Sequence, residues 1–304
     1  MVGYYKVADF NFGISLRNGV DLDKLLPSFR PFRNLSGIDE AKLFELVERE
    51  SLPERPESQL IDETVNDMGH TKLYRRDGGY RIELRYGKDV QPHIADVNPD
   101  FTEVDAFLRW DDRYVSLALS SMLRIVYSQA VLTHSAVSLH ASVVVNDGKA
   151  VLFMGKSGTG KSTHSRLWLE HLSGTYLLND DNPIVRLNED EAVAYGSPWS
   201  GKTHCYLNKS APVAAFVRLK QAPYNEFEVK EDVDAFKALL PGCSVVRYDP
   251  MLHSSLCATL IGLSSLAIVG EMACLPDKEA AELCYTNVIP SEAGAESRNL
   301  EDDL

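Results

Sequence analysis

The sequence is poor in basic residues, and this shortage excludes one broad class of partner. Its 31 Lys and Arg residues are outnumbered by 44 Asp and Glu residues, which gives a formal net charge of −13. Proteins that hold nucleic-acid backbones do so with dense positive charge. The balance therefore argues against a nucleic-acid partner. It leaves room for a nucleotide site, because backbone N–H groups and one lysine suffice for that.

Long apolar runs, a signal peptide and paired cysteines are also missing. No apolar run approaches the ~20 residues that span a bilayer, and the best candidates, 117–132 and 260–270, are interrupted by Arg124 and by Ser264-Ser265. The N-terminus lacks the basic and apolar regions of a signal peptide. The five cysteines are odd in number and lack metal-ligand spacing, which indicates a reducing compartment. We expect a cytoplasmic protein with no membrane partner.

The 304 residues allow one or two domains. Residues 1–110 are rich in turns and alternating stretches, which predict a β-rich accessory domain with a short helix over 39–50. A helix that begins near Asp111 carries apolar residues at helical spacing and opens a second domain, 111–288. Residues 289–304 are acidic and predict a disordered tail. Every motif that indicates ligand binding or catalysis lies in the second domain.

A tight turn sets the position of one histidine. The Asp-Gly pair at 147–148 lies between the apolar runs 139–145 and 150–154. Such a pair favours a two-residue hairpin, because both central residues of a type I′ turn need positive φ. Counting back along both strands places His140 opposite Gly155. There a histidine could contact a γ-phosphate or transfer a proton, and a structural strand histidine is the alternative.

The segment 155–162 matches the phosphate-loop pattern G-x-x-x-x-G-K-[ST]. It follows a predicted strand and opens a predicted helix, 162–172. In such a loop the backbone N–H groups cradle phosphates, Lys161 reaches the β- and γ-phosphates, and the Ser162 hydroxyl binds Mg²⁺. We therefore predict a nucleoside triphosphate site with Mg²⁺. Its expected residues are Gly155, Ser157, Gly158, Thr159, Gly160, Lys161, Ser162, Thr163 and, in a later loop, Lys202.

Two adjacent carboxylates, Asp180 and Asp181, follow the next predicted strand, 175–178. Beside a phosphate loop, one can hold Mg²⁺ while the other deprotonates the acceptor. A turn held by Asx hydrogen bonds is the alternative. Side chains alternate along a strand, which leaves open which aspartate has which role. The expected metal ligands are Ser162, Asp180 and Asp181, and the expected catalytic residues are Asp180, Asp181, His140 and Lys161.

The loop 196–202 offers two further candidates. Lys202 could bring a second positive charge to the triphosphate, and a solvated lysine is the alternative. Trp199 could stack on a base, but tryptophan is usually packed in a core, which we expect here. The remaining predicted elements are a hairpin over 184–195, strands near 213–219 and 267–273, and helices near 233–240, 251–261 and 278–285.

Together these motifs resemble the catalytic core of the HPr kinase/phosphorylase superfamily over roughly residues 133–290. The resemblance is carried by Leu139-His140-Ala141-Ser142, the glycine-rich loop fifteen residues after His140, and Leu178-Asn179-Asp180-Asp181. It implies an α/β (α+β) fold: a phosphoenolpyruvate carboxykinase/HPr kinase-like P-loop domain of mixed sheet and helices, with a smaller β-rich N-terminal domain. It also implies that His140 is the active-site histidine and that the aspartate pair supplies the metal ligand and the base.

The sequence is more similar still to HPr-kinase-like proteins of unassigned substrate, which carry a Gly-Ser/Thr-Pro-Trp-x-Gly-Lys stretch like that at 196–202. Three departures from true HPr kinases argue against the HPr protein as acceptor. Thr163 stands where they have an acidic residue, and the aspartates lie two residues farther from Lys161. Their later Arg- and Asn-bearing segment for the protein substrate is not evident.

The leading prediction is an ATP- and Mg²⁺-dependent kinase that transfers the γ-phosphoryl group to a hydroxyl acceptor on a protein or small molecule. One alternative is a carboxykinase-like lyase, which would need a further metal-binding set and an arginine cluster. The other is a regulatory module that binds nucleotide without turnover, with residues 1–110 sensing occupancy. The sequence leaves open the acceptor, the choice between ATP and GTP, and whether the chain forms a homo-oligomer.

Overall fold

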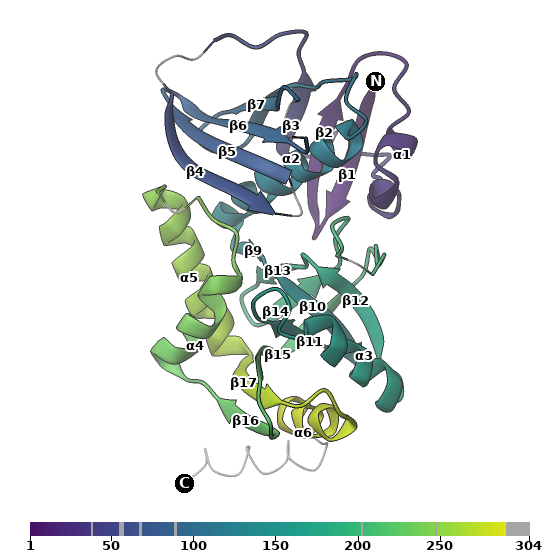
Figure 1. Cartoon of the computed structure of the whole chain (residues 1–304), viewed down its shortest axis with the longest axis vertical. Helices are drawn as coiled ribbons and strands as arrows, with labels where there is room; N and C mark the ends of the chain where they lie inside the picture. Colours follow the sequence, from purple (N-terminus) through teal and green to yellow (C-terminus); the bar gives the residue numbers. More distant parts are fainter. Residues whose placement is uncertain are drawn as a thin grey trace. The chain divides into compact units, whose positions relative to one another are not determined.

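The computed structural model describes residues 1–37, 39–54, 58–66, 69–87, 90–201, 203–246 and 248–289 (Figure 1). The fold is mixed α/β, with two sheets that each combine parallel and antiparallel strands. Two compact units are formed, one by residues 1–134 with 244–254 and the other by 135–243 with the residues from 255 onward. The helix expected to open the second domain thus groups with the first unit. Of the predicted tail, 289–304, the structure describes Ile289 alone, and residues 290–304 lie outside the described part of the chain.

The first unit is built on an eight-stranded sheet in the order β1-β2-β3-β8-β7-β6-β5-β4. β3 runs parallel to both β2 and β8, and the other neighbouring pairs are antiparallel. This part of the chain is therefore β-rich, as predicted. The strands are β1 (Val2–Val7), β2 (Phe10–Ser15), β3 (Lys42–Glu48), β4 (Gln59–Asn66), β5 (Gly69–Arg76), β6 (Gly79–Arg85), β7 (His93–Val97) and β8 (Glu103–Phe107).

Strand β3 replaces the short helix expected over 39–50, so that prediction is wrong. β3 lies inside the sheet with a parallel neighbour on each side, and Leu43, Phe44 and Leu46 are buried. The polar residues of β3, Lys42, Glu45 and Glu48, recur at every third position, so the strand shows no clean two-residue alternation. Periodicity alone cannot separate such a run from a segment of buried helix.

Helix α2 (Val115–Ala130) is the core helix that the apolar spacing predicts. Leu119, Met122 and Val126 are fully buried, and Figure 1 shows the helix lying against the sheet of its unit. With the residues up to His134 it is long and apolar enough to cross a membrane by length and composition, and it is the one such segment among the described residues. The expectation that no segment is long and apolar enough is therefore wrong by this measure. Of its 18 most apolar consecutive residues, 67% are buried inside the molecule. The segment therefore has the burial of a core helix.

The second unit contains a nine-stranded sheet whose central order is β12-β10-β11-β15-β17-β16. The first residues of the long strand β15 pair with β14, which continues the sheet to β13 and β9. The strands are β9 (Ala136–Ser138), β10 (Ala141–Asn146), β11 (Lys149–Met154), β12 (Tyr176–Asp181), β13 (Ile184–Leu187), β14 (Ala192–Tyr195), β15 (Ser210–Gln221), β16 (Glu226–Val229) and β17 (Ile268–Cys274).

Four helices belong wholly or partly to this unit: α3 (Lys161–His171), α4 (Asp232–Leu239), α5 (Pro250–Leu266) and α6 (Lys278–Val288). α3 and α6 pack together over a buried cluster that includes Phe153, Trp168, Met272 and Cys284. The predicted helices and strands that follow the glycine-rich loop are confirmed to within a few residues. This cluster anchors both the strand before the loop and the helix after it.

The hairpin of β10 and β11 has the register that the sequence predicts. Asn146 pairs with Lys149 and Ala141 pairs with Met154. Both central residues of the turn have positive φ, 48° for Asp147 and 74° for Gly148, as a type I′ turn requires. The placement of His140 next to the glycine-rich loop follows from this register.

Candidate functional site

Backbone pairing brings three strand ends to one edge of the sheet of the second unit. Ala141, the first residue of β10, pairs with Met154, the last residue of β11. Ala141 also pairs with Asp181, the last residue of β12. Because β10 is antiparallel to both neighbours, its beginning lies beside both of their ends. His140, the glycine-rich loop and the aspartate pair are therefore neighbours.

The loop between β11 and α3 has the backbone that its glycines allow. Gly155, Gly158 and Gly160 have φ values of 146°, 84° and 104°, a region that side chains disfavour. Thr159 closes the loop by donating its hydroxyl to the carbonyl of Lys156 at 2.8 Å. Gly160 is the N-cap of α3 and provides no capping side chain, so the first N–H groups of the helix and its dipole can receive an anion.

A chain of polar contacts joins Lys161, His140 and Asp181. The Nζ of Lys161 lies 2.9 Å from the Nε2 of His140 and 3.0 Å from the carbonyl oxygen of Gly155. The Nδ1 of His140 lies 2.9 Å from an Oδ1 of Asp181. An ammonium group can only donate, so Nε2 accepts and Nδ1 carries the proton that is donated to Asp181. The His140 side chain is 41% exposed, which leaves its ring accessible.

The electrostatic setting of Lys161 favours an added anion. Burial lowers the pKa of Lys161, while the charges of Asp181 and Asp180 oppose that shift. The net direction is downward, so the two carboxylates do not fully compensate the cost of burying the ammonium group. A phosphate beside Lys161 would supply the missing compensation.

Ser162 and Asp180 form a second polar pair. The Oγ of Ser162 donates to an Oδ1 of Asp180 at 2.9 Å, and Asp180 is buried. In an octahedral Mg²⁺ shell with oxygens at ~2.0–2.1 Å, adjacent ligands lie about 2.9 Å apart. The two oxygens thus already have the spacing of neighbouring Mg²⁺ ligands, and the residues fit this metal. Asp181, the third predicted ligand, contacts His140.

The rest of a magnesium shell would have to come from substrate and water. No group of three or more His, Cys, Asp or Glu side chains suited to a metal occurs in the described part of the chain. Mg²⁺ in phosphoryl-transfer sites is held by one or two carboxylates together with substrate phosphates, and it keeps several waters. The Ser162–Asp180 pair fits that pattern better than it fits a site in which protein ligands alone surround the metal.

Asn179 organises the segment beside the aspartates, a role that the sequence analysis missed. Its Nδ2 donates to the Oγ of Ser197 at 3.2 Å and to the carbonyl of Trp199 at 3.1 Å. Its Oδ1 accepts from the backbone N–H of Asp181 at 3.1 Å. Asn179 is fully buried, and a buried amide needs such partners. An asparagine at the end of an apolar strand was the available signal.

The remaining predicted residues are distributed around the loop. Trp199 is buried, in agreement with the packing role expected for it. Thr163 lies in the first turn of α3, where it lines a groove together with Gly158 and His164. Lys202 lies outside the described residues, so its expected contact with the triphosphate stays a prediction. Ser157 is an exposed residue of the loop.

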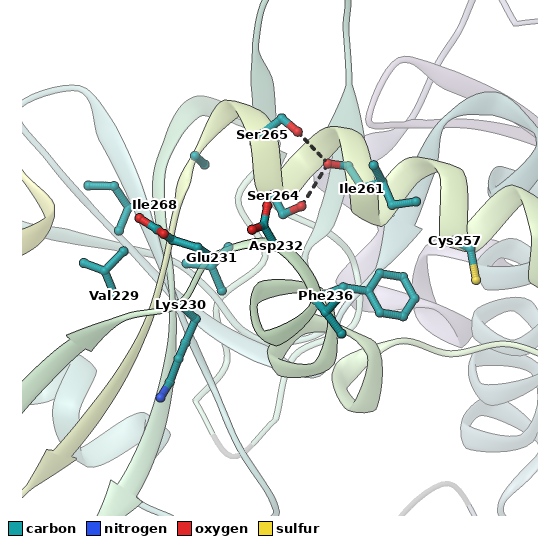
Figure 2. Close-up of a pocket in the computed structure, with 13 residues that line it drawn as sticks. Val229, Lys230, Glu231, Asp232, Phe236, Cys257, Ile261, Ser264, Ser265 and Ile268 are labelled. Carbon is teal, nitrogen blue, oxygen red and sulfur yellow. Dashed lines mark hydrogen bonds between the residues drawn. The ribbon is translucent and has the colours of Figure 1, made fainter.

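A separate and larger cavity of about 710 Å³ is lined by residues of β16, α4, α5 and β17 (Figure 2). Val229, Phe236 and Ile261 supply much of its apolar wall. Figure 2 shows the hydroxyls of Ser264 and Ser265 bonded to the Ile261 carbonyl, so these polar groups are already paired. None of the predicted site residues that the structure describes lines this cavity. The side chains that could take part in catalysis gather instead at the glycine-rich loop.

Comparisons with known proteins give little beyond this geometry. No family model matches the chain, and no curated protein sequence matches it. Among solved structures, the HPr(Ser) kinase/phosphatase from Coxiella burnetii is similar over 54% of this chain and 96% of its own chain. The identity is 12% and the TM-score is 0.33. This is a distant structural relationship, and it assigns neither an activity nor a substrate.

Proposed function

We propose that the chain is an ATP- and Mg²⁺-dependent phosphotransferase of HPr kinase-like type, with a cytoplasmic location and a hydroxyl group as acceptor. The observation that carries the proposal is the meeting of a chain of three polar residues and a polar pair at one glycine-rich loop. Lys161 contacts His140, which contacts Asp181, and Ser162 contacts Asp180. Phosphoryl transfer needs a cation for the transferred group, a metal site and a base, and these contacts supply candidates for all three.

The contacts favour different roles for the two aspartates. Asp180 would hold Mg²⁺ together with Ser162, because these two oxygens have the spacing of adjacent metal ligands. Held by these two residues, Mg²⁺ would supply positive charge that offsets the charge of the phosphates. Asp181, paired with the Nδ1–H of His140, would be the base.

In the proposed reaction Asp181 accepts the proton of the acceptor hydroxyl as that oxygen attacks the γ-phosphorus. A new O–P bond forms, the bond from the bridging oxygen to the γ-phosphorus breaks, and ADP leaves with the electron pair. Lys161 would stabilise the charge on the γ-phosphoryl oxygens. His140 would orient Asp181 and Lys161 through its two ring nitrogens.

The described part of the first unit, residues 1–134 with 244–254, offers no comparable gathering of groups, and we assign it an accessory role. The single test that carries most weight is ATP binding by the Lys161→Ala variant, measured by calorimetry with Mg²⁺. Losing a charge-assisted contact to phosphate weakens binding by about 10- to 150-fold. Lys156→Ala is the matched control, because Lys156 is an exposed lysine of the same loop whose loss is expected to leave affinity within about threefold.

Turnover separates this proposal from its rivals. With Mg²⁺ and ATP, a kinase releases ADP in step with a phosphorylated acceptor recovered from a metabolite pool or lysate. A regulatory module binds ATP without any product, and a carboxykinase-like lyase consumes a dicarboxylate. Unchanged ATP binding by folded Lys161→Ala protein would remove the basis of the whole assignment.

A further inference from the structure

In the sheet of the second unit, different strands lie on the two sides of the glycine-rich loop. The strand order β12-β10-β11-β15-β17 places β11, which leads into the loop, between two sets of neighbours. His140 and the aspartates lie at the ends of β10 and β12, on one side. On the other side, β15 and β17 run parallel to β11, so their last residues reach the same edge.

A groove of about 430 Å³ lies on that second side. Its wall is formed by the loop and α3, through Gly158, Thr163 and His164, and by residues at and just beyond the ends of the two strands, among them Ala222, Leu275 and Pro276. No Asp, Glu, Lys or Arg is among the residues that line it. The groove therefore suits an uncharged, partly apolar group of a size typical of ligand pockets, ~300–1,000 Å³.

One of the residues that line the groove has a buried polar atom without a partner. His164 is 2% exposed, and its Nε2 finds no hydrogen-bond partner among the described residues. The ring packs edge-on against Phe153 at a centroid distance of 4.7 Å. Buried polar atoms in native proteins are nearly always paired, which makes this atom a candidate to meet a ligand.

The groove also has a fixed rim. The side-chain amide of Gln221, at the end of β15, donates to the carbonyl of Gly158 at 3.2 Å. This contact ties the loop to the strand across the groove. Leu275 leaves 39% of its surface exposed at the same place, which gives the groove an apolar face against which a flat ring can stack.

We propose that this groove holds the nucleoside of the triphosphate, with the base against Leu275 and Pro276 and the Nε2 of His164 bonded to the base or the ribose. The proposal rests on the proposed function, because it assumes a triphosphate in the loop. A chain of phosphates that ends with its γ-group beside His140 and Asp181 leaves the loop on the opposite side, where the groove begins. The larger cavity of Figure 2 shares no residue with the loop.

Calorimetric titrations with ATP and with inorganic tripolyphosphate, both with Mg²⁺, test this placement. Wild-type protein is expected to bind ATP at least about tenfold more tightly than tripolyphosphate, because only ATP has a group for the groove. Ala222→Trp fills the groove and is expected to weaken ATP binding by about tenfold or more, while tripolyphosphate binding changes less than about threefold. Val229→Trp, placed in the cavity of Figure 2, is the matched control and leaves both affinities unchanged.

A second variant covers the case in which Ala222→Trp does not fold. His164→Phe keeps the ring against Phe153 and removes only the unpaired nitrogen, so it is expected to raise the melting temperature of the nucleotide-free protein. It should weaken ATP binding by about 2- to 10-fold, the effect of one neutral hydrogen bond, without weakening tripolyphosphate binding. A purely structural histidine would instead lose stability and keep its ATP affinity.

Failure of the two proposals is distinguishable. If wild-type protein binds neither probe, the proposed function fails and the groove loses its ligand. If both probes bind equally, or if groove variants leave ATP binding unchanged or weaken both probes equally, the groove assignment is overturned while the phosphate site stands. Loss of ATP binding in Val229→Trp alone would move the nucleoside to the other cavity.

Discussion

Each unit of the molecule contains a histidine–aspartate pair, and the two pairs differ in what surrounds them. In the first unit the Nε2 of His93 lies 3.2 Å from Asp112, and its Nδ1 accepts the backbone N–H of Arg109 at 3.1 Å. The side chain of His93 is fully buried. In the second unit His140 pairs with Asp181 at 2.9 Å but is 41% exposed and has a lysine as its other partner.

The comparison shows that a histidine beside an aspartate is not by itself a site. Both nitrogens of His93 are used by fixed groups of its own unit, so nothing remains to exchange with a ligand. His140 has an ammonium group as one of its partners, and that ammonium also contacts carbonyls of a glycine-rich loop. An ammonium group can leave a carbonyl or an imidazole for a phosphate, which makes the second pair responsive to a ligand.

The largest expected effect concerns the carboxylates. Asp180→Asn and Asp181→Asn, measured singly, should each keep ATP affinity within about tenfold of wild type, because metal ligands and bases act mainly on the transition state. At least one of them should lose about 10²-fold or more in turnover, measured as ADP release with acceptor present. Asp112→Asn, in the other pair, is the control and should keep its turnover. Normal turnover in both site variants would erase the contrast between the two pairs.

Replacing each histidine in turn should give smaller effects, which differ in kind between the two pairs. His93→Ala removes the partner of the buried Asp112 Oδ2 and should cost about 1–3 kcal/mol of stability, measured by urea unfolding, with no change in ATP affinity. His140→Ala should lower turnover by about tenfold, with little effect on unfolding, because its ring is partly solvated. The opposite result, a stability loss at His140 and an activity loss at His93, would reverse the assignment.

The smallest effect is a pH dependence of stability. Burial lowers the pKa of His93 below its ordinary value of 6.5, against the opposing charge of Asp112. As pH falls through about 6.5, the unfolded chain therefore takes up a proton that the folded chain resists, and stability decreases. Above that pH both states are neutral at this position and the histidine contributes no slope.

Melting temperatures of wild type and His93→Gln between pH 7.5 and 5 measure this contribution as a difference. The wild type should lose stability more steeply than the variant over the lower half of the range. Parallel curves would mean that His93 titrates alike in the folded and unfolded chain. The distinction between the buried His93–Asp112 pair and the accessible His140–Asp181 pair would then lose its thermodynamic support.

The features that could be predicted from the sequence are those governed by short-range rules. The turn at Asp147-Gly148 sets the strand register through its backbone requirement, and the register places His140 at the loop. The glycine spacing similarly predicts a strand–loop–helix unit with Lys161 and Ser162 in its first turn. In both cases a few adjacent residues suffice, because the geometry involved spans a single turn.

Other features depend on partners that are distant in the chain. Strand β3 looks like a helix until its two parallel neighbours are known. The groups to which the Asn179 Nδ2 donates lie in the segment 196–201. The separate contacts of Asp180 and Asp181 arise only when β10 pairs with β12. The unpartnered nitrogen of His164 becomes apparent only once the core around Phe153 is assembled, so nothing in the sequence singles this histidine out.

The pairing of β10 with both β11 and β12 limits how this region can fluctuate. The residues that flank the site, Met154, Ala141 and Asp181, belong to one continuous ladder, so they cannot separate unless the strands unzip. Backbone amides of β10 should accordingly exchange hydrogen with solvent among the slowest in the second unit, at rates set by its global opening. Any motion that admits reactants or releases products therefore falls to segments outside the ladder, such as the loop 155–160.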